Sequence, residues 1–357
     1  VNNTFDSKGR VTAQSDALGN RWIFVYDEVN RKTTVTDPLG RVTTYQYDGE
    51  WRLVTETNAL GQNKVYVYDS NGNRTKVTDP RGYATQYTYD GRGNTTSTTD
   101  AISGTTTMTY DVQDNLLTVQ DPLSRTTSFV YDAKGNLLQR TNALGQTTSF
   151  AYNSFGQMTS TTDELGRVTV YTYDNHGNRT AEFDALGGTT SFSFDTIGRV
   201  TAATDALARS TTYSYDNANR LLALSEPLGR LVAYGYDRVG NRTVITDARG
   251  GVTTFVYDAK DRLISTTDPL SKTTTYTYDS VGNQTAVTDP LGHATTFTYD
   301  ALNRRTAATD ALGNRNQYSY DANGNRTQLR DANNRTTAYT YDALNRLTRV
   351  TDAAGGT

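Results

Sequence analysis

Short runs in which aromatic and small residues alternate recur along the whole chain. Residues 295–299 read Thr-Thr-Phe-Thr-Tyr, and the runs that end at Tyr278 and Tyr341 have the same pattern. A period of two in Thr, Tyr, Phe and Val predicts a β-strand. The two aromatic residues of each run, Phe297 and Tyr299 in this example, are therefore expected to point to one face of a sheet.

Two turn signals separate these strands. The first turn follows a Tyr-Asp pair, as in residues 279–282 (Asp-Ser-Val-Gly), and its fourth position holds Gly, Asn or Asp in every case but Trp51. These residue types tolerate a positive φ. The second turn, as in residues 289–292 (Asp-Pro-Leu-Gly), has the composition of a type I turn, and all six prolines of the chain occupy its second position. A second strand, residues 284–288, is predicted between the two turns.

The same unit repeats every 21 residues. The Tyr-Asp pair or its nearest variant recurs at that step from Phe5 to Tyr341, and an Asp, Asn or Glu follows eleven places after each aromatic residue. Seventeen such units account for all 357 residues. We therefore predict one array over residues 1–357, without a separate catalytic domain. Because the chain opens part-way through a unit, we expect it to be an excerpt from a longer repeat tract.

The residues that we expect to build the repeat are aromatic strand ends and turn formers, and no catalytic, cofactor or metal role is assigned to them. They are Tyr26, Asp27, Tyr68, Asp69, Gly72, Asp79, Pro80, Tyr278, Asp279, Gly282, Asp289, Pro290, Leu291, Gly292, Phe297 and Tyr299.

The number of strands predicts a coiled sheet. Two strands in each unit, at about 4.8 Å per strand, would make a flat sheet roughly 160 Å wide. Open sheets of more than about ten strands curl or split, so we expect one long coiled β-sheet that forms a hollow spiral shell or tube wall. Its stability is expected to come from the backbone ladder, from Tyr and Phe stacking between neighbouring units, and from residues such as Leu291 packing at the turns.

Composition and charge narrow the function classes. The chain has 25 Tyr, which argues against disorder despite a mean hydropathy of -0.66. A formal net charge of -3 gives no sign of a nucleic-acid partner. The chain has no apolar run long enough for a transmembrane segment. The absence of Cys excludes disulfides and thiolate metal sites.

The repeat offers no unique cluster of chemical groups. The two histidines, His176 and His293, occupy different positions of different turns, so we predict no shared metal site or catalytic triad. The turn aspartates recur too regularly for a catalytic pair, because perturbed acids need unique environments. They also lack the close spacing of calcium-binding loops. We therefore expect no cofactor and no enzymatic activity.

The complete unit resembles the YD repeat of the Rhs family. It reads Tyr-Asp-x-x-Gly-Asn-Arg-x-Thr-x-x-Thr-Asp-Pro-Leu-Gly-Arg-x-Thr-x-Tyr, nearly complete at residues 236–246 and 26–45, and the resemblance covers the entire chain. The family includes bacterial polymorphic toxins, cocoon subunits of insecticidal toxin complexes, wall-associated proteins and teneurins. The resemblance implies a β-sheet that spirals into a hollow shell, which in the toxins encloses a C-terminal effector. The family's autoprotease segment, Pro-x-x-x-x-Asp-Pro-x-Gly-Leu, has no match in this chain.

Two functions fit these features. The first is a structural β-shell segment of a secreted or cell-surface Rhs-type protein, which encloses or scaffolds an effector domain and has neighbouring repeats of a longer parent chain as partners. The second is an extracellular filament, stalk or adhesin, in which unpaired sheet edges propagate into a fibre and the repeats bind surface carbohydrate or cells.

Overall fold

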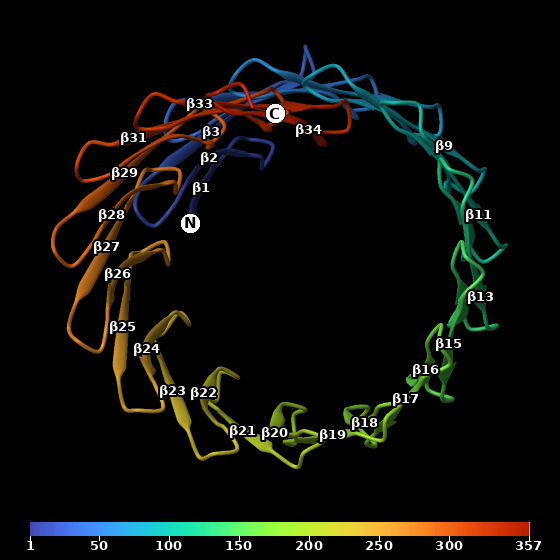
Figure 1. The fold of residues 1–357 in the computed structure, drawn as a ribbon. Helices are drawn as coiled ribbons and strands as arrows, with labels where there is room; N and C mark the ends of the chain where they lie inside the picture. Colours follow the sequence, from blue (N-terminus) through green and yellow to red (C-terminus); the bar gives the residue numbers. More distant parts are fainter. Residues whose placement is uncertain (357) are drawn as a thin grey trace. The chain divides into compact units, whose positions relative to one another are not determined.

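The computed structural model describes residues 1–356. Over these residues the chain forms 34 β-strands, all in one sheet, and no helix (Figure 1). Consecutive strands are joined by short turns. The prediction of an all-β fold with two short antiparallel strands in each 21-residue repeat is confirmed.

The strands belong to two compact units. Unit 1 comprises Val1–Tyr89, Thr98–Gly104 and Phe255–Thr357, and unit 2 comprises Asp90–Ser97 and Thr105–Thr254. β10 (Thr95–Thr99) and β25 (Val252–Tyr257) contain residues of both units.

Unit 1 contains two series of strands. The first series is β1 (Asn2–Phe5), β2 (Val11–Ser15), β3 (Arg21–Asp27), β4 (Lys32–Thr36), β5 (Val42–Tyr47), β6 (Leu53–Thr57), β7 (Asn63–Tyr68), β8 (Arg74–Thr78) and β9 (Ala84–Tyr89). The second series is β26 (Leu263–Thr267), β27 (Thr273–Tyr278), β28 (Gln284–Thr288), β29 (Ala294–Tyr299), β30 (Arg305–Thr309), β31 (Arg315–Tyr320), β32 (Arg326–Arg330), β33 (Thr336–Tyr341) and β34 (Leu347–Thr351). In both series each strand pairs antiparallel with the next.

Unit 2 contains one series. It consists of β11 (Thr105–Tyr110), β12 (Leu116–Gln120), β13 (Thr126–Tyr131), β14 (Leu137–Thr141), β15 (Thr147–Tyr152), β16 (Met158–Thr162), β17 (Val168–Tyr173), β18 (Arg179–Phe183), β19 (Thr189–Phe194), β20 (Val200–Thr204), β21 (Ser210–Tyr215), β22 (Leu221–Ser225), β23 (Leu231–Tyr236) and β24 (Arg242–Thr246). The pairing is again antiparallel between consecutive strands.

The strand faces follow the sequence alternation. In β29 the side chains of Phe297 and Tyr299 are half-buried, while those of Thr296 and Thr298 are exposed. Among the described residues the fully buried apolar side chains are only Ala13, Tyr66, Ala181 and Ala307. Because so little is fully buried, the stability of the sheet depends on its hydrogen bonds and on half-buried contacts between neighbouring strands.

The first turns close with a bulge, except the one between β3 and β4. Between β27 and β28 the register runs from Thr275↔Thr288 to Thr277↔Ala286 and then shifts at Tyr278, which faces Gln284. The amide of Gly282 donates to the carbonyl of Asp279 at 3.2 Å, and Gly282 has a φ of 104°. A turn that ends in a residue of positive φ is the three-residue hairpin loop with a bulge. Trp51, the exception in the sequence pattern, also takes a positive φ, of 61°.

One first turn lies one residue later than the sequence predicts. β3 and β4 pair without a bulge through Tyr26↔Thr33 and Asp27↔Lys32, and the turn bond joins the amide of Arg31 to the carbonyl of Glu28 at 3.3 Å. Asp27 is therefore the last residue of β3 rather than the first residue of the turn. The fourth turn position holds Asn30, and the positive φ falls on the next residue, Arg31, at 50°.

Candidate functional site

The two kinds of turn lie at opposite ends of the strands. Because successive strands run antiparallel, all first turns gather at one end of the strands of a unit and all second turns at the other end. We call the row of first turns the first rim and the row of second turns the second rim. The residues predicted to form turns lie on these rims, with Asp69, Gly72 and Asp279 on the first and Asp79 and Asp289 on the second.

Many of the aspartates that open a turn use both carboxylate oxygens inside that turn, whereas turns with Gly at the fifth position, such as the one opened by Asp184, use Oδ1 alone. In the first turn, Oδ1 of Asp279 accepts from the amides of Val281, Gly282 and Asn283 at 3.1, 2.8 and 2.8 Å, and Oδ2 accepts from Nδ2 of Asn283 at 2.8 Å. In the second turn, Asp289 accepts from the amides of Leu291 and His293 at 2.9 Å, and its Oδ2 lies 2.9 Å from Nδ1 of His293.

These hydrogen bonds lower the pKa values of the turn carboxyls. The side chain and the amide of Asn136 hold the pKa of Asp132 below its usual value, and those of His293 do the same for Asp289. For Asp300, burial raises the pKa, but the hydrogen bonds from Arg304 outweigh burial, so the pKa again lies below the usual value. Hydrogen bonds to a carboxylate favour its charged form.

Three turns open with Asn, and each of them has Gln at the fifth position. Nδ2 of Asn153 donates to Oε1 of Gln157 at 2.7 Å, and the same bond joins Asn58 to Gln62 and Asn142 to Gln146, at 3.0 Å in both. The direction is opposite to that in the Asp turns, where the fifth residue donates. In these turns the first residue is the donor and the fifth residue is the acceptor. The hydrogen bond between the two positions is therefore kept, although the first residue carries no charge.

An arginine at the fifth position of a first turn links two repeats. Nε of Arg262 donates to its own Asp258 at 2.7 Å, and Nη1 donates to the carbonyl of Asp279 in the next repeat at 3.1 Å. Its guanidinium also lies 4.7 Å from the ring centroid of Tyr278, close enough for a cation–π contact. Arg52, Arg199, Arg220 and Arg304 make the same three contacts.

The tyrosine of the Tyr-Asp pair bonds back to the preceding strand. The hydroxyl of Tyr278 donates to the carbonyl of Leu263, at the start of β26, at 2.8 Å. β26 and β27 pair only from Ser265 onward, so this carbonyl lies outside the ladder and the hydroxyl supplies its partner. Tyr26, Tyr68 and Tyr299 make the same bond fifteen residues back, at 2.9, 2.9 and 2.7 Å.

Removing this hydroxyl is expected to loosen the strand pair. For Tyr278→Phe we expect a loss of about 1 kcal/mol, because the carbonyl of Leu263 loses its partner while the ring contact with Arg262 remains. Hydrogen exchange of residues 263–278 should then be about fivefold faster. The control is Tyr131→Phe, since the hydroxyl of Tyr131 makes no hydrogen bond in the described part of the chain. Equal effects of the two substitutions would contradict this assignment.

The aromatic side chains contact other residue types than we predicted. We predicted stacking of Tyr and Phe between neighbouring units, but the repeated ring contacts are those with guanidinium groups, and an aromatic pair forms between Tyr47 and Trp51, whose ring centroids are 6.1 Å apart. The prediction failed because the residue beside the Tyr ring comes from the preceding first turn, which holds Arg and not an aromatic residue.

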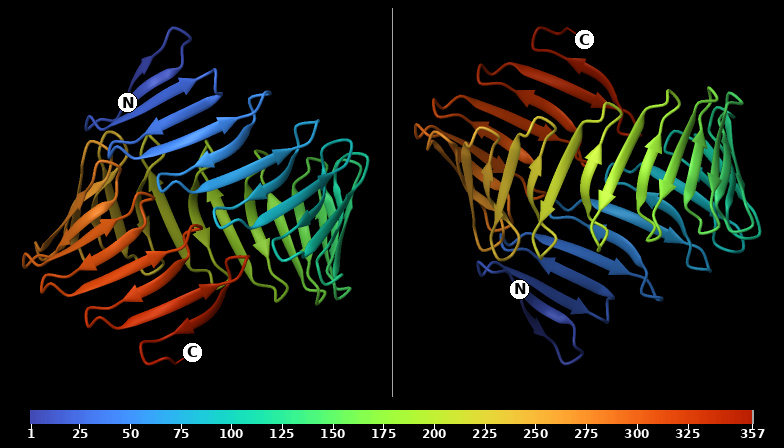
Figure 2. Two further views of the ribbon diagram at one scale, coloured as in Figure 1. Left: turned by 90° about the horizontal axis from the view of Figure 1, so that it is seen from above. Right: turned by 90° about the horizontal axis from the view of Figure 1, so that it is seen from below.

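In unit 1 the second rim of the first strand series contacts the first rim of the second series (Figure 2). Nε of Arg41 donates to its own Asp37 at 2.6 Å. Its Nη1 reaches the carbonyl of Asp300 at 3.2 Å and its Nη2 reaches Oδ1 of Asn303 at 3.0 Å. The side chain of Arg41 is only 14% exposed, so the contact encloses it.

A second arginine repeats this contact two repeats further along. Nη2 of Arg81 donates to the carbonyl of Asp342 at 2.8 Å and to Oδ1 of Asn345 at 2.9 Å, and Nη1 lies 3.4 Å from Oδ2 of Asp321. Arg81 stands where most second turns have Leu. Nδ2 of Asn323 donates to Oδ2 of Asp79 in the same contact.

A lysine makes the contact at the other end of the rims. Nζ of Lys260 lies 2.7 Å from Oδ2 of Asp16 and 5.5 Å from the ring centroid of Trp22. Burial raises the pKa of Asp16, but the hydrogen bonds from Lys260 and Asn20 outweigh it and hold the pKa well below its usual value.

The carbonyls that accept from Arg41 and Arg81 share a sequence context. The first turn that precedes Asp300 has Asn283 at its fifth position, and the one that precedes Asp342 has Asn325. An Asn side chain does not reach the next turn's carbonyl as Arg does, so the carbonyl stays open for the opposite rim. The Asn instead donates to the fourth residue of the next turn, as Asn283 does to Asn303 at 2.7 Å.

The leucines of the second turns are exposed, which corrects our prediction. Leu291 was expected to pack at its turn but is 81% exposed, because it lies at the tip of a turn and points away from the strands. Leu18, Leu39 and Leu60, whose turns belong to the contacting rim of unit 1, are 44–48% exposed. The leucine tips are therefore half-covered in the series that meets another rim. Pro80 and Pro290 occupy the second position of their turns, where no strand hydrogen bond is needed.

No cluster of the described residues resembles a catalytic or metal centre. Over residues 1–356 no group of three or more His, Asp or Glu side chains is placed to hold a metal ion. Among these residues no helix is long and apolar enough to cross a membrane. His176 lines an open groove of about 700 Å³ between two first turns of unit 2, together with Phe155 and Tyr171.

Sequence reasoning missed the residues that join repeats and rims. They are the arginines at the fifth position of first turns, and Arg41, Arg81 and Lys260 on the contacting rims. A signal for the first group was present, because the fifth position of a first turn holds Arg or Asn in every unit except the one with Gln157.

Three comparisons place the chain among known proteins. Residues 49–192 match the family model described as Teneurin YD-shell. The RHS Repeat model matches residues 5–40, 26–62, 194–231, 219–252, 257–294, 278–315 and 320–357, which together make up more than half of the chain. No curated protein matches the chain.

Several solved structures have a similar fold. The crystal structure of TcdB2-TccC3-TEV is 18% identical with a TM-score of 0.82, over 99% of this chain and 22% of that one. The crystal structure of TcdB2-TccC3-Cdc42 is 18% identical with a TM-score of 0.83, over 97% and 22%. The Tc holotoxin pore of Photorhabdus luminescens with a TccC3 variant is 17% identical with a TM-score of 0.81, over 97% and 22%.

This chain spans about a fifth of the length of those structures, and at this identity the likeness concerns the fold alone. The family models match the repeats from Phe5 onward, in agreement with the resemblance seen in the repeat unit. The chain therefore belongs to the RHS repeat family of YD-shell proteins.

Proposed function

We propose that the chain is a non-catalytic wall segment of a secreted or cell-surface Rhs-type protein, and that it encloses or scaffolds other parts of a longer parent chain. The observation that supports this proposal best is the contact between rims in unit 1. There, turns about 240 to 260 residues apart in sequence bond through Arg41, Arg81 and Lys260. Bonds between distant turns are what a wall needs in order to have no gap between adjacent parts of its sheet.

The repeated carboxylates support the absence of catalysis in this proposal. Many of the acids that open a turn, such as Asp279 and Asp289, accept hydrogen bonds on both oxygens from their own turn. A general acid or base needs a free oxygen within reach of substrate. The same environment recurs in turn after turn, so no single Asp is set apart for chemistry.

The parent protein provides the test. We expect electron microscopy of the intact parent to show closed particles with density inside, which would be the enclosed effector. Long open fibres would contradict enclosure and would favour the filament or adhesin. Hydrolase activity of the purified chain that is lost on changing a single turn Asp would contradict the absence of catalysis.

A further inference from the structure

Unit 2 presents a row of uncovered apolar tips on its second rim. The tips are leucines at the third position of consecutive second turns, and they are 72–95% exposed. They are Leu123, Leu144, Leu165, Leu186, Leu207 and Leu228. In unit 1 the corresponding leucines of the contacting rim are 44–48% exposed. An exposed apolar row of this kind marks an interaction surface.

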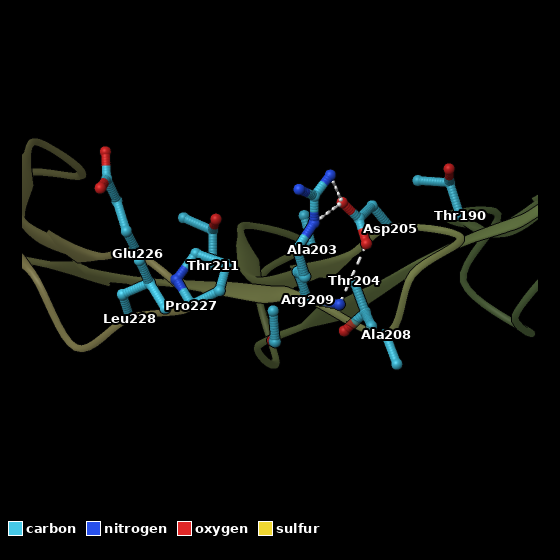
Figure 3. A pocket seen from close by; sticks show the side chains of 11 residues that line it. Thr190, Ala203, Thr204, Asp205, Ala208, Arg209, Thr211, Glu226, Pro227 and Leu228 are labelled. Carbon is cyan, nitrogen blue, oxygen red and sulfur yellow. Dashed lines mark hydrogen bonds and ion pairs between the residues drawn. The ribbon is translucent and has the colours of Figure 1, made fainter.

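Grooves separate neighbouring tips. The groove between the turns that begin at Asp205 and Glu226 has a volume of about 870 Å³ and is lined by Leu228 and Pro227 on one side and by Arg209 on the other (Figure 3). Arg209 is held against Asp205 at the wall of this groove, as the dashed lines show. The rim thus combines apolar tips with fixed cations.

The cations of this rim are placed as Arg41 is placed in unit 1. Arg125, Arg167 and Arg209 each donate through Nε to the Asp that opens their turn, at 2.7 Å, as Arg41 does at 2.6 Å. Their side chains are 61–63% exposed, whereas that of Arg41 is 14% exposed. Each guanidinium is already oriented by its own turn, and no opposite rim covers it.

The first rim of unit 2 carries the complementary acceptors. The first turns that begin at Asp111, Asp132, Asn153 and Asp195 each follow a turn with Asn at the fifth position, which is the context that leaves the carbonyls of Asp300 and Asp342 open. Nδ2 of Asn94 donates to Oδ1 of Asp114 at 2.7 Å, as Asn283 does to Asn303. The side chain of Asp114 is 52% exposed, although its Oδ1 also lies 3.0 Å from Nη1 of Arg92.

The spacing of donors and acceptors also matches. Arg125, Arg167 and Arg209 recur at every second repeat, and the acceptor turns that begin at Asp111, Asn153 and Asp195 have the same step, with the turn of Asp132 as a further acceptor between the first two. The contact in unit 1 has the same step, because the turns of Arg41 and Arg81 lie two repeats apart and their acceptors, Asp300 and Asp342, do as well. Apolar tips stand on this rim too, where Phe155 is 87% and Ile197 64% exposed.

We propose that a second copy of this chain covers these rims, with the second rim of unit 2 in one copy docked on the first rim of unit 2 in the next. The arginines of one copy donate to the turn carbonyls and to Asp114 of the other, and the leucine tips are buried between first-turn tips. The two surfaces differ, so the contact is head-to-tail and further copies add in line. This association is separate from the proposed wall function and does not depend on it.

Sedimentation velocity of the purified chain at increasing concentration tests the proposal. We expect reversible growth beyond the monomer. Leu165→Glu with Leu186→Glu should block the second rim, and Phe155→Glu with Ile197→Glu should block the first rim, so that each variant alone stays monomeric. All four side chains are exposed, which makes loss of folding unexpected, and circular dichroism checks it. A mixture of the two variants should form one-to-one heterodimers through the two rims that remain intact.

A conservative substitution tests the donors alone. Asn occupies the fifth position of the second turns at Asn20 and Asn314 and donates to the Asp that opens the turn, at 2.9 Å in both. Changing Arg125, Arg167 and Arg209 together to Asn should therefore keep the turns and weaken association at least about tenfold. A wild-type chain that stays monomeric would overturn the proposal. So would association that persists in both rim variants, because it would then run through another surface, such as the strand edges of β1 and β34.

Discussion

Acidification from pH 7 to about pH 2 is expected to unfold the array, because its turn aspartates bind protons at lower pH when folded than when unfolded. The pKa values of Asp132, Asp174, Asp289 and many other turn carboxyls lie below the usual value. A group with a depressed folded pKa stabilises the fold fully above its unfolded pKa of about 3.9. That contribution is lost as the pH falls from there through the folded pKa.

Acid unfolding is expected to be a large effect because the same Asp turn is repeated along the chain. A single turn Asp lies partly exposed at the end of the strands and contributes little, but nearly every turn of the described chain opens with one. Protonation removes the carboxylate acceptor for the turn amides, and in many turns also for the side chain of the fifth residue, over the same pH range. Circular dichroism at constant, high salt should follow the loss of the sheet, since salt screens the repulsion among the 35 Lys and Arg residues but not proton uptake by the turns.

The chain itself supplies the control for this acid transition. Asn153 and Gln157 form the turn bonds without a titrating group. Asp132→Asn with Asn136→Gln would copy this pair into a neighbouring turn, and Asp174→Asn with Asn178→Gln would copy it into a second. We expect unchanged stability at pH 7 and a transition at lower pH than in the wild type. A transition that does not move would show that the turn carboxylates do not drive the unfolding.

The strands and turns could be predicted from the sequence because their causes are local. Alternation in residues 295–299 defines the faces of β29, and Gly282 or its equivalent defines where the chain reverses. The turn between β3 and β4 is an exception, because it lies one residue later and Asp27 joins the strand. Its fourth position holds Asn30, and Asn takes a positive φ at that position in other first turns, such as Asn303.

The contact between rims could not be predicted, because it joins residues such as Arg41 and Asp300 that are 259 positions apart. Which turns meet depends on how strongly the sheet curves over many strands, and no single repeat determines that curvature. The exposure of Leu291 could not be predicted for a related reason. A leucine at a turn tip is covered only if another rim lies against it, as Leu39 shows by its lower exposure of 48%.

The variation between repeats carries more information than the consensus. Arg262 at the fifth position of a first turn bonds the next repeat, whereas Asn283 at the same position leaves the next carbonyl to the opposite rim. Arg at the fifth position therefore marks a first turn that bonds the next repeat within the sheet. Asn at the same position marks a first turn after which a carbonyl can accept a contact from another rim.

Replacing Arg81 with Leu is expected to open the contact between rims, although Leu is the usual residue at that place in the repeat. The substitution removes the hydrogen bonds to Asp342 and Asn345 and the ion pair with Asp321. Because Arg81 is charged and its side chain is only 14% exposed, we expect local stability to fall by about 2 kcal/mol. Hydrogen exchange in residues 318–346 should then be roughly thirtyfold faster.

Arg249→Leu is the matched control for Arg81→Leu, since Arg249 holds the same position in a second turn of unit 2 and its side chain is exposed. The sheet ladder around each site uses backbone groups only, so neither substitution should change strand pairing. If the two variants show equal exchange, the bonds made by Arg81 contribute nothing to holding the rims together. Faster exchange in the Arg81 variant alone would show that one guanidinium holds together strands whose turns lie about 260 residues apart in the sequence.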